Sequence, residues 1–204
     1  MRHFGQERYR QVFDLDHTLL FCNISFEFGK HLYRRGFFSF PTFCRLLSYY
    51  LRFKYFNLSV AELHAQVFEK LFLGRRLKDI EQEADLFLEN LSRWLNPKVA
   101  ALLEEESLIL SSSPDFLVER VARRLNVKGK GTGYSVDKEG KLCEVSFVME
   151  GSLKAHYLPE GPSIYYTDSI LDLPVMLQAG RVVAVRPDRQ LRKLAKEKNW
   201  EIID

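Results

Sequence analysis

The sequence predicts an α/β fold in which a doubly wound, mostly parallel sheet carries a helical insertion. From residue 107 onward, short apolar runs alternate with helical segments, which is typical of a parallel sheet covered on both faces. Residues 22–105 instead show helical patterns without a convincing strand. Two carboxylates, Asp14 and Asp16, directly follow the first expected strand, at the edge where such sheets bind ligands.

The size and composition of the chain indicate one domain with an insertion. Its 204 residues are 46% hydrophobic, enough for a substantial core, and its net charge of +3 is too small to indicate a nucleic-acid partner. Three scattered cysteines favour reduced thiols, and residues 1–10 show no secretory signal. No apolar run reaches the roughly 18 residues of a membrane span. We therefore expect a cytoplasmic protein.

In the first half of the chain, one strand precedes a block of helices. The strand is expected over residues 9–13, where alternating side chains end at the acidic pair. The helices are expected from apolar stripes at helical spacing and from start or stop signals. They are a helix through 43–51 with Pro41 in its first turn, a helix from the capping box at Ser59 and Glu62 to Gly74, and a helix through 77–95 that ends before Pro97.

In the second half, strands and helices alternate. A short buried strand over residues 107–110 runs into three serines, and Pro114 starts a helix. A hairpin with a polar turn follows. The remaining elements in chain order are the hairpin strands 131–136 and 142–148, a strand at 163–167, a helix at 171–178, a strand at 182–185, a helix at 189–198 and a strand at 201–203.

Further polar groups follow the later strands or lie in loops between them. Ser111 and Ser112 precede a helix N-terminus, where hydroxyls and free N–H groups make an anion site. Lys154 could neutralise phosphate oxygens, or it could be a solvated surface lysine. Asp168 and Asp172 directly follow a strand at a spacing that suits a metal ligand and its partner, although they could also serve only as helix N-terminal charge.

The order of these motifs resembles the haloacid dehalogenase-like superfamily of phosphohydrolases over nearly the whole chain. A DxDxT sequence follows the first strand, serine follows the next, a lysine lies in a loop, and DxxxD follows a later strand. The downstream half resembles the phosphoserine-phosphatase-like branch, subfamily IB, in segments 110–118, 166–174 and 184–188.

This resemblance implies a particular division of the chain. Residues 1–21 and 106–204 would form the Rossmann-like core domain. Residues 22–105 would form an all-helical cap of the C1 type. Such a cap is mobile and closes over the site, where it excludes water and contacts the leaving group.

The resemblance also implies a Mg²⁺-dependent phosphomonoester hydrolase that forms an aspartyl-phosphate. Asp14 would attack phosphorus as the nucleophile. Asp16 would protonate the leaving alcohol and then act as base for the hydrolytic water. Hydrolytic dehalogenation is disfavoured, because the relatives that catalyse it lack the second aspartate, which is present here as Asp16.

The same resemblance assigns the ligands of the metal ion and the phosphate. Mg²⁺ would be held by Asp14, the backbone carbonyl of Asp16 and Asp168. Ser111, the N–H of Ser112 and Lys154 would bind the phosphate oxygens. The supporting residues would be Thr18 for the loop geometry and Asp172, which would orient Asp168 or a metal-bound water.

The chain departs from the family pattern at several positions. His17 stands where glycine is frequent, in a left-handed position; we favour an exposed or packing role for it over substrate contact. Thr167 replaces a leading glycine of the last motif. Asn23 stands where phosphoserine phosphatases carry a glutamate, and their arginine-containing cap motif is not recognisable in residues 58–72. Phosphoserine is therefore disfavoured as the substrate, which we expect to be another small-molecule phosphomonoester.

The insertion is rich in aromatic side chains interleaved with basic ones. The favoured interpretation is that the aromatic stripe packs inward with its arginines in water, and the alternative is transient contact with phospholipid. The aromatic residues are Phe37, Phe38, Phe40, Phe43, Tyr49, Tyr50, Phe53, Tyr55 and Phe56, and the basic ones are Arg34, Arg35, Arg45, Arg52 and Lys54.

Two other functions remain open on the same fold. A catalytically inert sensor would keep the site and bind a phosphorylated ligand without turnover. A phosphotransferase would pass the phosphoryl group to an acceptor other than water. A receiver domain of phospho-signalling is excluded by motif order, because its phosphoacceptor follows a later strand and it lacks an insertion of this size.

Overall fold

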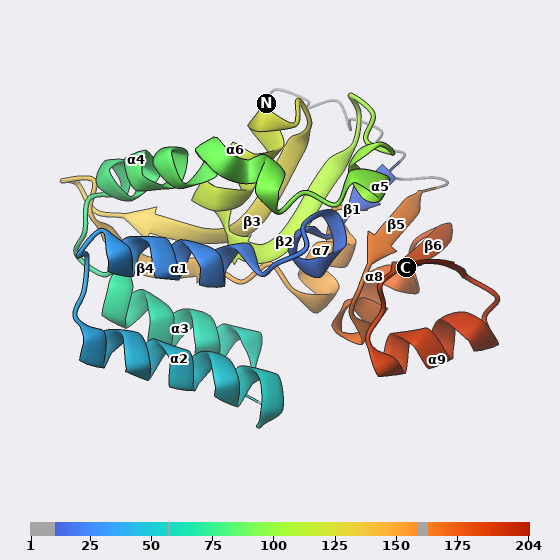
Figure 1. Cartoon of the computed structure of the whole chain (residues 1–204), viewed down its shortest axis with the longest axis horizontal. Coiled ribbons are helices and arrows are strands. Elements are labelled where there is room, and N and C mark those ends of the chain that lie inside the picture. The colour runs from blue at the N-terminus through green and yellow to red at the C-terminus, as the bar shows by residue number, and fades with distance from the viewer. Residues whose placement is uncertain (1–10, 57, 159–162) are drawn as a thin grey trace.

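A seven-stranded sheet forms the centre of the molecule (Figure 1). The structure is a computed structural model that describes residues 11–56, 58–158 and 163–204. The strands lie in the order β4-β3-β2-β1-β5-β6-β7, and every neighbouring pair is parallel except β3 and β4. Their bounds are β1 Gln11–Phe13, β2 Leu108–Pro114, β3 Lys128–Val136, β4 Leu142–Phe147, β5 Ile164–Thr167, β6 Arg181–Val185 and β7 Glu201–Ile203. The predicted mostly parallel α/β sheet is confirmed.

Successive residues of the strands face opposite sides of the sheet and join two separate apolar clusters. Phe13 and Ile109 lie in a cluster with α1, α4 and α6, whereas Val12 and Leu108 lie in one with α7, α8 and α9. This alternation follows from the two-residue period of a strand. The helices are α1 Ile24–Arg34, α2 Phe40–Tyr55, α3 Val60–Leu71, α4 Leu77–Phe87, α5 Pro97–Ala100, α6 Asp115–Arg124, α7 Gly151–His156, α8 Leu173–Met176 and α9 Arg189–Glu197.

The order of the strands brings the ends of β2, β1 and β5 together. The chain leaves β1, pairs on one side with β2, and returns much later to pair on the other side with β5. A parallel sheet with such a change of direction opens a crevice at the carboxyl ends of its strands. Asp14, Ser111 and Asp168 therefore reach one region although they are far apart in the sequence.

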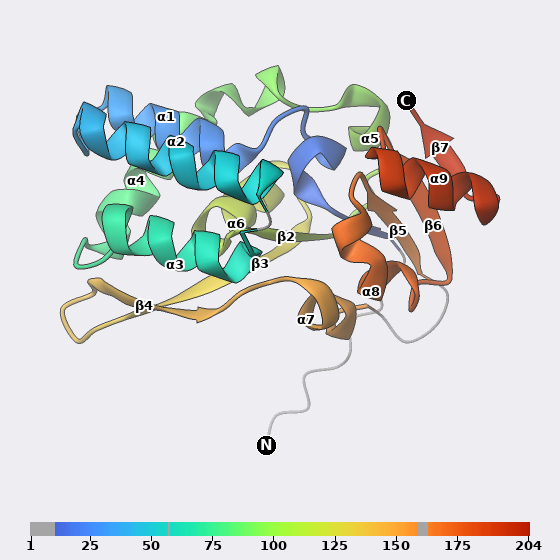
Figure 2. The ribbon, with the colours of Figure 1, turned by 90° about the horizontal axis from the view of Figure 1, so that it is seen from below.

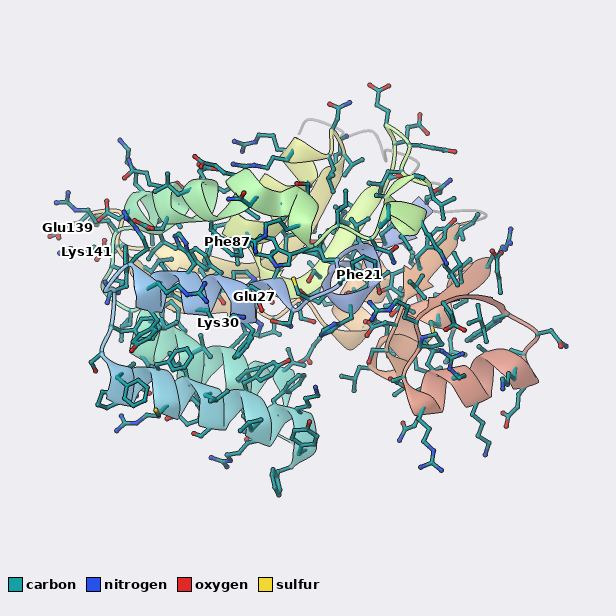
Figure 3. The ribbon with its side chains drawn as sticks, viewed as in Figure 1. Phe21, Glu27, Lys30, Phe87, Glu139 and Lys141 are labelled. Atoms are coloured by element: carbon teal, nitrogen blue, oxygen red, sulfur yellow. The ribbon has the colours of Figure 1, made fainter. Side chains whose placement is uncertain are left out.

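The helical insertion shares its apolar core with the sheet. Phe28 of α1 is fully buried and contacts Phe87 of α4 and Phe116 of α6, with ring centroids 5.5 and 6.2 Å apart; Phe87 is labelled in Figure 3. The loop after α3 is bound to the β3–β4 hairpin, because Gly74 N donates to Leu142 O at 2.8 Å. Apolar contacts thus cross the expected boundary between core and cap, and that division remains a prediction.

The pair α2 and α3 lies outermost in the insertion. In Figures 1 and 2 this pair lies apart from α8 and α9, which lie beside β5 and β6 on the right. The β3–β4 hairpin runs along α3. α2 contacts α1 through stacked rings, Tyr50 on Phe26 and Phe43 on Tyr33, with centroids 4.7 and 4.8 Å apart. α2 is described in full and has no buried side chain, unlike α1 and α3.

Several elements follow the sequence signals closely. Pro41 lies in the first turn of α2, and the capping box of Ser59 and Glu62 opens α3, with both of its hydrogen bonds present. Gly74 takes a positive φ of 74°, three residues after α3 ends. The expected first strand is confirmed for residues 11–13, while Tyr9 and Arg10 lie outside the described residues.

Other expected elements have different bounds. The strand expected at 107–110 extends to Pro114, because Thr132 of β3 donates to Ser112 O at 2.6 Å and the pairing with β3 resumes at Pro114. The helix expected through 77–95 ends at Phe87 and continues as a 3₁₀ segment, in which Asn90 leaves helical geometry. The helix expected at 171–178 is reduced to α8, after a 3₁₀ turn over Ile170–Asp172.

Within the described residues, no helix has the length and apolar character that a bilayer crossing requires. Cys22, Cys44 and Cys143 are free cysteines, in agreement with the expected reduced thiols.

The shared core predicts that α4 contributes strongly to the stability of the whole fold. Ile80→Ala should lower the free energy of unfolding by about 2–5 kcal/mol, because Ile80 is fully buried in the cluster that joins α4 to the sheet. Leu86→Ala on the same helix is the matched control, since Leu86 is 46% exposed and should cost no more than about 0.5 kcal/mol. Chemical denaturation followed by circular dichroism measures both. Equal losses in the two variants would contradict a shared core.

Candidate active site

The first strand ends in a tight turn that presents Asp14 and Asp16. Asp14 N donates to Tyr166 O of β5 at 2.8 Å, which extends the β1–β5 pairing to the first carboxylate. The following residues, Leu15–Leu19, form a single wide turn in which His17 has φ 59°. His17 thus occupies the expected left-handed position, and its side chain is exposed.

Asp16 is held by donors from two other elements. Its Oδ1 accepts from Ile24 N at the start of α1, at 2.6 Å, and its Oδ2 accepts from Ser113 Oγ at 2.7 Å and Ser111 Oγ at 3.3 Å. Burial raises the pKa of Asp16, while the bonds from Ile24 and Ser113 act in the opposite direction. A raised pKa favours the protonated form of the carboxyl group, which is the form that a general acid needs.

Lys154 forms a buried ion chain with two aspartates. Its Nζ donates to Asp14 Oδ1 at 2.7 Å and to Asp172 Oδ1 at 2.8 Å, and the side chain is 2% exposed. Burial alone would lower the pKa of Lys154, but Asp14 and Asp172 outweigh burial and hold that pKa well above its ordinary value. The alternative of a solvated surface lysine is wrong, and Lys154 lies on α7 rather than in a loop.

Asp172 is fixed by strand β5 as well as by Lys154. Its Oδ2 accepts from Tyr165 Oη at 2.8 Å and from Thr167 Oγ1 at 2.7 Å. The hydrogen bonds of Asp172 therefore position Lys154. The expected role of Asp172 in orienting Asp168 or a metal-bound water remains a prediction. Thr167, which replaces the family's glycine, supplies one of these donors.

Asp168 completes a group of four neighbouring carboxylates with Asp14, Asp16 and Asp172. Thr18 Oγ1 donates to Asp168 Oδ1 at 3.4 Å, which ties the first loop to the end of β5. Burial, together with the charges of Asp172 and Asp16, raises the pKa of Asp168 to about 7. Burial also raises the pKa of Asp14 well above its ordinary value, although Lys154 opposes this. The group thus contains one buried lysine and four carboxylates, and this excess of negative charge favours the binding of a further cation.

The donor chemistry of this group fits Mg²⁺. Among the described residues, no cluster of three or more His, Cys, Asp or Glu side chains is placed to hold a metal ion. The expected set contains two carboxylates, Asp14 and Asp168, and the backbone carbonyl of Asp16. Mg²⁺ is commonly bound by one or two carboxylates together with water and substrate phosphate, so two side chains are sufficient.

The three serines at the end of β2 lie beside the first loop. Ser111 Oγ accepts from Ser113 N at 3.0 Å and lies 3.3 Å from Asp16 Oδ2, so Ser111 and Asp16 are brought together as expected. Ser112 lines the same cavity, and its carbonyl oxygen is bound by Thr132. Ser113, which the sequence interpretation omitted, makes the shorter contact to Asp16 and also pairs with Ser25 Oγ at 2.6 Å.

His64 and Tyr134 form a side-chain hydrogen bond that the sequence did not reveal. His64 Nδ1 lies 2.8 Å from Tyr134 Oη and joins α3 to β3. Burial lowers the pKa of His64 to about 4, against a smaller opposite effect of the Ser112 backbone. A lone histidine on an amphipathic helix carried no signal for this contact, because its partner lies 70 residues away.

A cavity of about 400 Å³ lies over the carboxylates. Its floor contains Asp14, Asp16, Ser111, Lys154 and Asp168, and side chains of α2 and α3 form its roof. The aromatic residues of the insertion divide accordingly. Phe38, Phe43, Tyr50 and Phe53 line the cavity, whereas Phe40, Tyr55 and Phe56 are more than 60% exposed.

Residues 12–177 match the family described as haloacid dehalogenase-like hydrolase. The chain belongs to this family. It is therefore an enzyme of the hydrolase class, and the predicted superfamily is confirmed. Phosphatases of this family generally use Mg²⁺.

The relatives found by sequence include named phosphatases. The chain is 28% identical to phosphoserine phosphatase SerB1 of Mycobacterium tuberculosis, over 94% of this chain and 69% of that protein. It is 23% identical to histidinol-phosphatase of Neisseria meningitidis, over 95% of this chain and 97% of that protein. These similarities agree with the phosphoserine-phosphatase-like branch that the motifs resemble.

Solved structures share the fold. A Bordetella pertussis protein of unknown function superposes with a TM-score of 0.84 at 19% identity, covering 97% of this chain and 98% of that one. A substrate-bound phosphoserine phosphatase complex superposes with a TM-score of 0.57 at 14% identity, covering 96% and 92%. These superpositions show that the chain shares the fold of these proteins over nearly all of its length.

The ion chain predicts a large structural cost for removing its cation. Lys154→Met should lower the free energy of unfolding by about 3–5 kcal/mol, because Asp14 and Asp172 would stay buried without the cation that pairs with both. Lys30→Met is the control, since Lys30 pairs with Glu27 near the surface and should cost at most about 1 kcal/mol. Adding Asp172→Asn to Lys154→Met should recover part of the loss in denaturant titrations. If the stability losses of the two single variants simply added in the double variant, Lys154 and Asp172 would not be coupled.

His64 predicts a pH-dependent stability term. Because its folded pKa of about 4 lies below its ordinary 6.5, the unfolded chain binds the proton more readily between these values. The term is therefore fully present above pH 6.5 and is lost as the pH falls towards 4. In urea titrations, the unfolding free energy of the wild type minus that of His64→Phe should therefore fall as the pH is lowered through this window. A difference independent of pH would contradict a neutral, desolvated His64.

Proposed function

We propose that this hydrolase is a Mg²⁺-dependent phosphomonoesterase that forms an aspartyl-phosphate on Asp14. The observation that carries this proposal is the convergence of Asp14, Asp16, Asp168 and Lys154 at one end of three adjacent strands, on the floor of a single cavity. Each of these side chains also stands in the sequence motifs whose order resembles that of the family.

In the first half of the reaction, an Asp14 oxygen attacks phosphorus and the bond from phosphorus to the leaving oxygen breaks. Asp16 donates its proton to that oxygen, so the alcohol leaves neutral. The donors Ile24 N and Ser113 Oγ hold the Asp16 carboxyl in place, and burial raises its pKa, a direction that favours the protonated form.

In the second half, water attacks the acyl phosphate. Asp16, now deprotonated, takes a proton from the water, and cleavage of the bond between phosphorus and Asp14 regenerates the carboxylate. Lys154 lies 2.7 Å from Asp14 Oδ1, which suits it to hold the nucleophile and to neutralise charge on the phosphate. Ser111 Oγ and the N–H of Ser112 would bind the remaining phosphate oxygens.

Asp14, Asp168 and the carbonyl of Asp16 would hold Mg²⁺. When bound, it would reduce the repulsion between the carboxylate nucleophile and the phosphate dianion. The excess of carboxylates over the single buried lysine supports this assignment. Thr18 and Asp172 would act as positioning residues, through Asp168 and Lys154 respectively.

The surroundings of the cavity support a substrate other than phosphoserine. Asn23 Oδ1 accepts from Phe26 N at 2.9 Å and so caps α1. Among the described residues that line the cavity, there is no arginine to bind a substrate carboxylate. Histidinol phosphate, the substrate class in the name of one relative, belongs in the same test panel. The cytoplasmic location expected from the sequence remains a prediction.

Hydrolysis of an aryl phosphate tests the proposal. Purified protein should release phosphate with Mg²⁺, should lose activity in EDTA, and should regain it when Mg²⁺ is returned. Asp14→Asn should reduce kcat by roughly 10³-fold or more, because the nucleophile is removed. Asp79→Asn, a change of the same chemistry at an exposed position of α4, is the control and should stay within about twofold of wild type.

The outcomes separate the remaining functions. A folded protein that binds a phosphate-mimicking fluoride complex but shows no turnover would be the inert sensor. Release of the aryl alcohol that depends on an added acceptor alcohol, with transfer of the phosphoryl group to that acceptor in place of phosphate release, would identify a phosphotransferase. Activity of Asp14→Asn near the wild-type rate would remove Asp14 from the nucleophile role.

A further inference from the structure

The roof of the cavity over the carboxylates is built from one apolar stripe of α2. Phe43, Leu46, Leu47, Tyr50 and Phe53 recur at three- and four-residue spacing, so they share one face of the helix. All five line the cavity. A stripe of this kind usually packs into a core, yet no α2 side chain is buried. The stripe therefore provides an apolar surface to the active site.

A matching stripe of α3 faces the same cavity. Val60, Leu63, Val67 and Leu71 also follow helical spacing and line it. His64 lies within this stripe, but burial keeps it neutral and Tyr134 lies 2.8 Å from its ring nitrogen. The two helices contact each other, so the space between their stripes is bounded by apolar groups on both sides.

Three polar side chains that line the cavity near α1, Lys30, Asn23 and Ser25, have polar partners within the protein. Lys30 Nζ lies 2.5 Å from Glu27 Oε1, and both are labelled on α1 in Figure 3. Asn23 caps α1, and Ser25 contacts Ser113. A charged or strongly polar leaving group would lose its hydration here without gaining a matched partner.

The dimensions favour an elongated apolar group. The stripe from Phe43 to Phe53 extends about 15 Å at the helical rise of 1.5 Å per residue. The volume of about 400 Å³ falls in the range of small-molecule sites. An aliphatic chain that runs from the carboxylates along α2 would fill this space.

We propose that the enzyme acts on phosphomonoesters of aliphatic alcohols, with the phosphate at Asp14 and the alkyl chain between the stripes of α2 and α3. This substrate class rests on the proposed phosphatase function. The chain would gain affinity through burial of its methylene groups, and the alcohol released would be an uncharged alkanol.

A series of n-alkyl monophosphates from butyl to dodecyl, each below its micellar concentration, tests the proposal. The value of kcat/KM should rise roughly two- to fourfold for each methylene until the cavity is filled. Phosphoserine and glycerol phosphate should be poorer substrates than octyl phosphate. A flat or falling series would overturn the proposal even if an aryl phosphate is hydrolysed.

Binding to Asp14→Asn separates this inference from the catalytic one. Calorimetric affinities of the same alkyl phosphates for this variant do not depend on turnover, and they should strengthen with chain length by the same factor per methylene. If the wild type hydrolyses nothing while this trend is present, the proposed catalysis fails and the apolar site stands. Affinities independent of chain length would overturn the site.

Two leucines one turn apart on α2 provide matched variants. Leu47 lines the cavity, whereas Leu51 is 42% exposed and lies outside the lining. Leu47→Gln should reduce the dodecyl-to-butyl ratio of kcat/KM by roughly tenfold, and Leu51→Gln should leave it unchanged. Leu63→Gln on α3 repeats the test from the facing stripe if Leu47→Gln fails to fold, which thermal melting would show. Equal ratios in the cavity and control variants would overturn the proposal.

Discussion

The buried contact of Lys154 with Asp14 and Asp172 constrains the rest of the site. Taking one ammonium and two carboxylates out of water costs several kcal/mol per ion unless their geometry and hydrogen bonds compensate. Lys154 is 2% exposed, and Asp172 is supported by the hydroxyls of Tyr165 and Thr167. These contacts tie the end of β1, the helix α7 and the end of β5 to one another. The position of the nucleophile thus depends on segments that are 140 residues apart in the chain.

The sheet explains why this arrangement can form. Its central strand β1 is short but is paired on both sides, so the loop that carries Asp14 and Asp16 projects from the middle of the sheet. Residues of the central strands alternate between two apolar clusters, and the carboxylates Asp14 and Asp168 follow directly where β1 and β5 end. Carboxylates that repel one another are held together because the apolar core fixes the strands that carry them. A cation would relieve that repulsion.

The cavity combines two chemically different halves. Its floor holds charged groups from strand ends and from α7, while its roof is apolar and comes from α2 and α3. Because the two halves come from different parts of the chain, the floor can keep the family's chemistry while the roof selects the leaving group. No side chain of α2 is fully buried, and the contacts of this helix with α1 and α3 are made by partly exposed side chains. Such an element suits a movement when a substrate enters.

The sequence by itself determined the alternation of strands and helices after residue 107, the order of the motifs and the local caps, because these depend on residues that are neighbours in the chain. It did not reveal α1, and several element bounds differ from the expected ones. The acidic turn at Asp14 and the capping box at Ser59 are of this kind. Only the tertiary structure decided that Lys154 is buried, that Ser113 rather than Ser111 makes the shorter contact to Asp16, and that the α2 stripe faces the cavity. The physical reason is that charge burial and the direction of an apolar face are set by partners distant in sequence, and a residue's own pattern of neighbours carries no information about them.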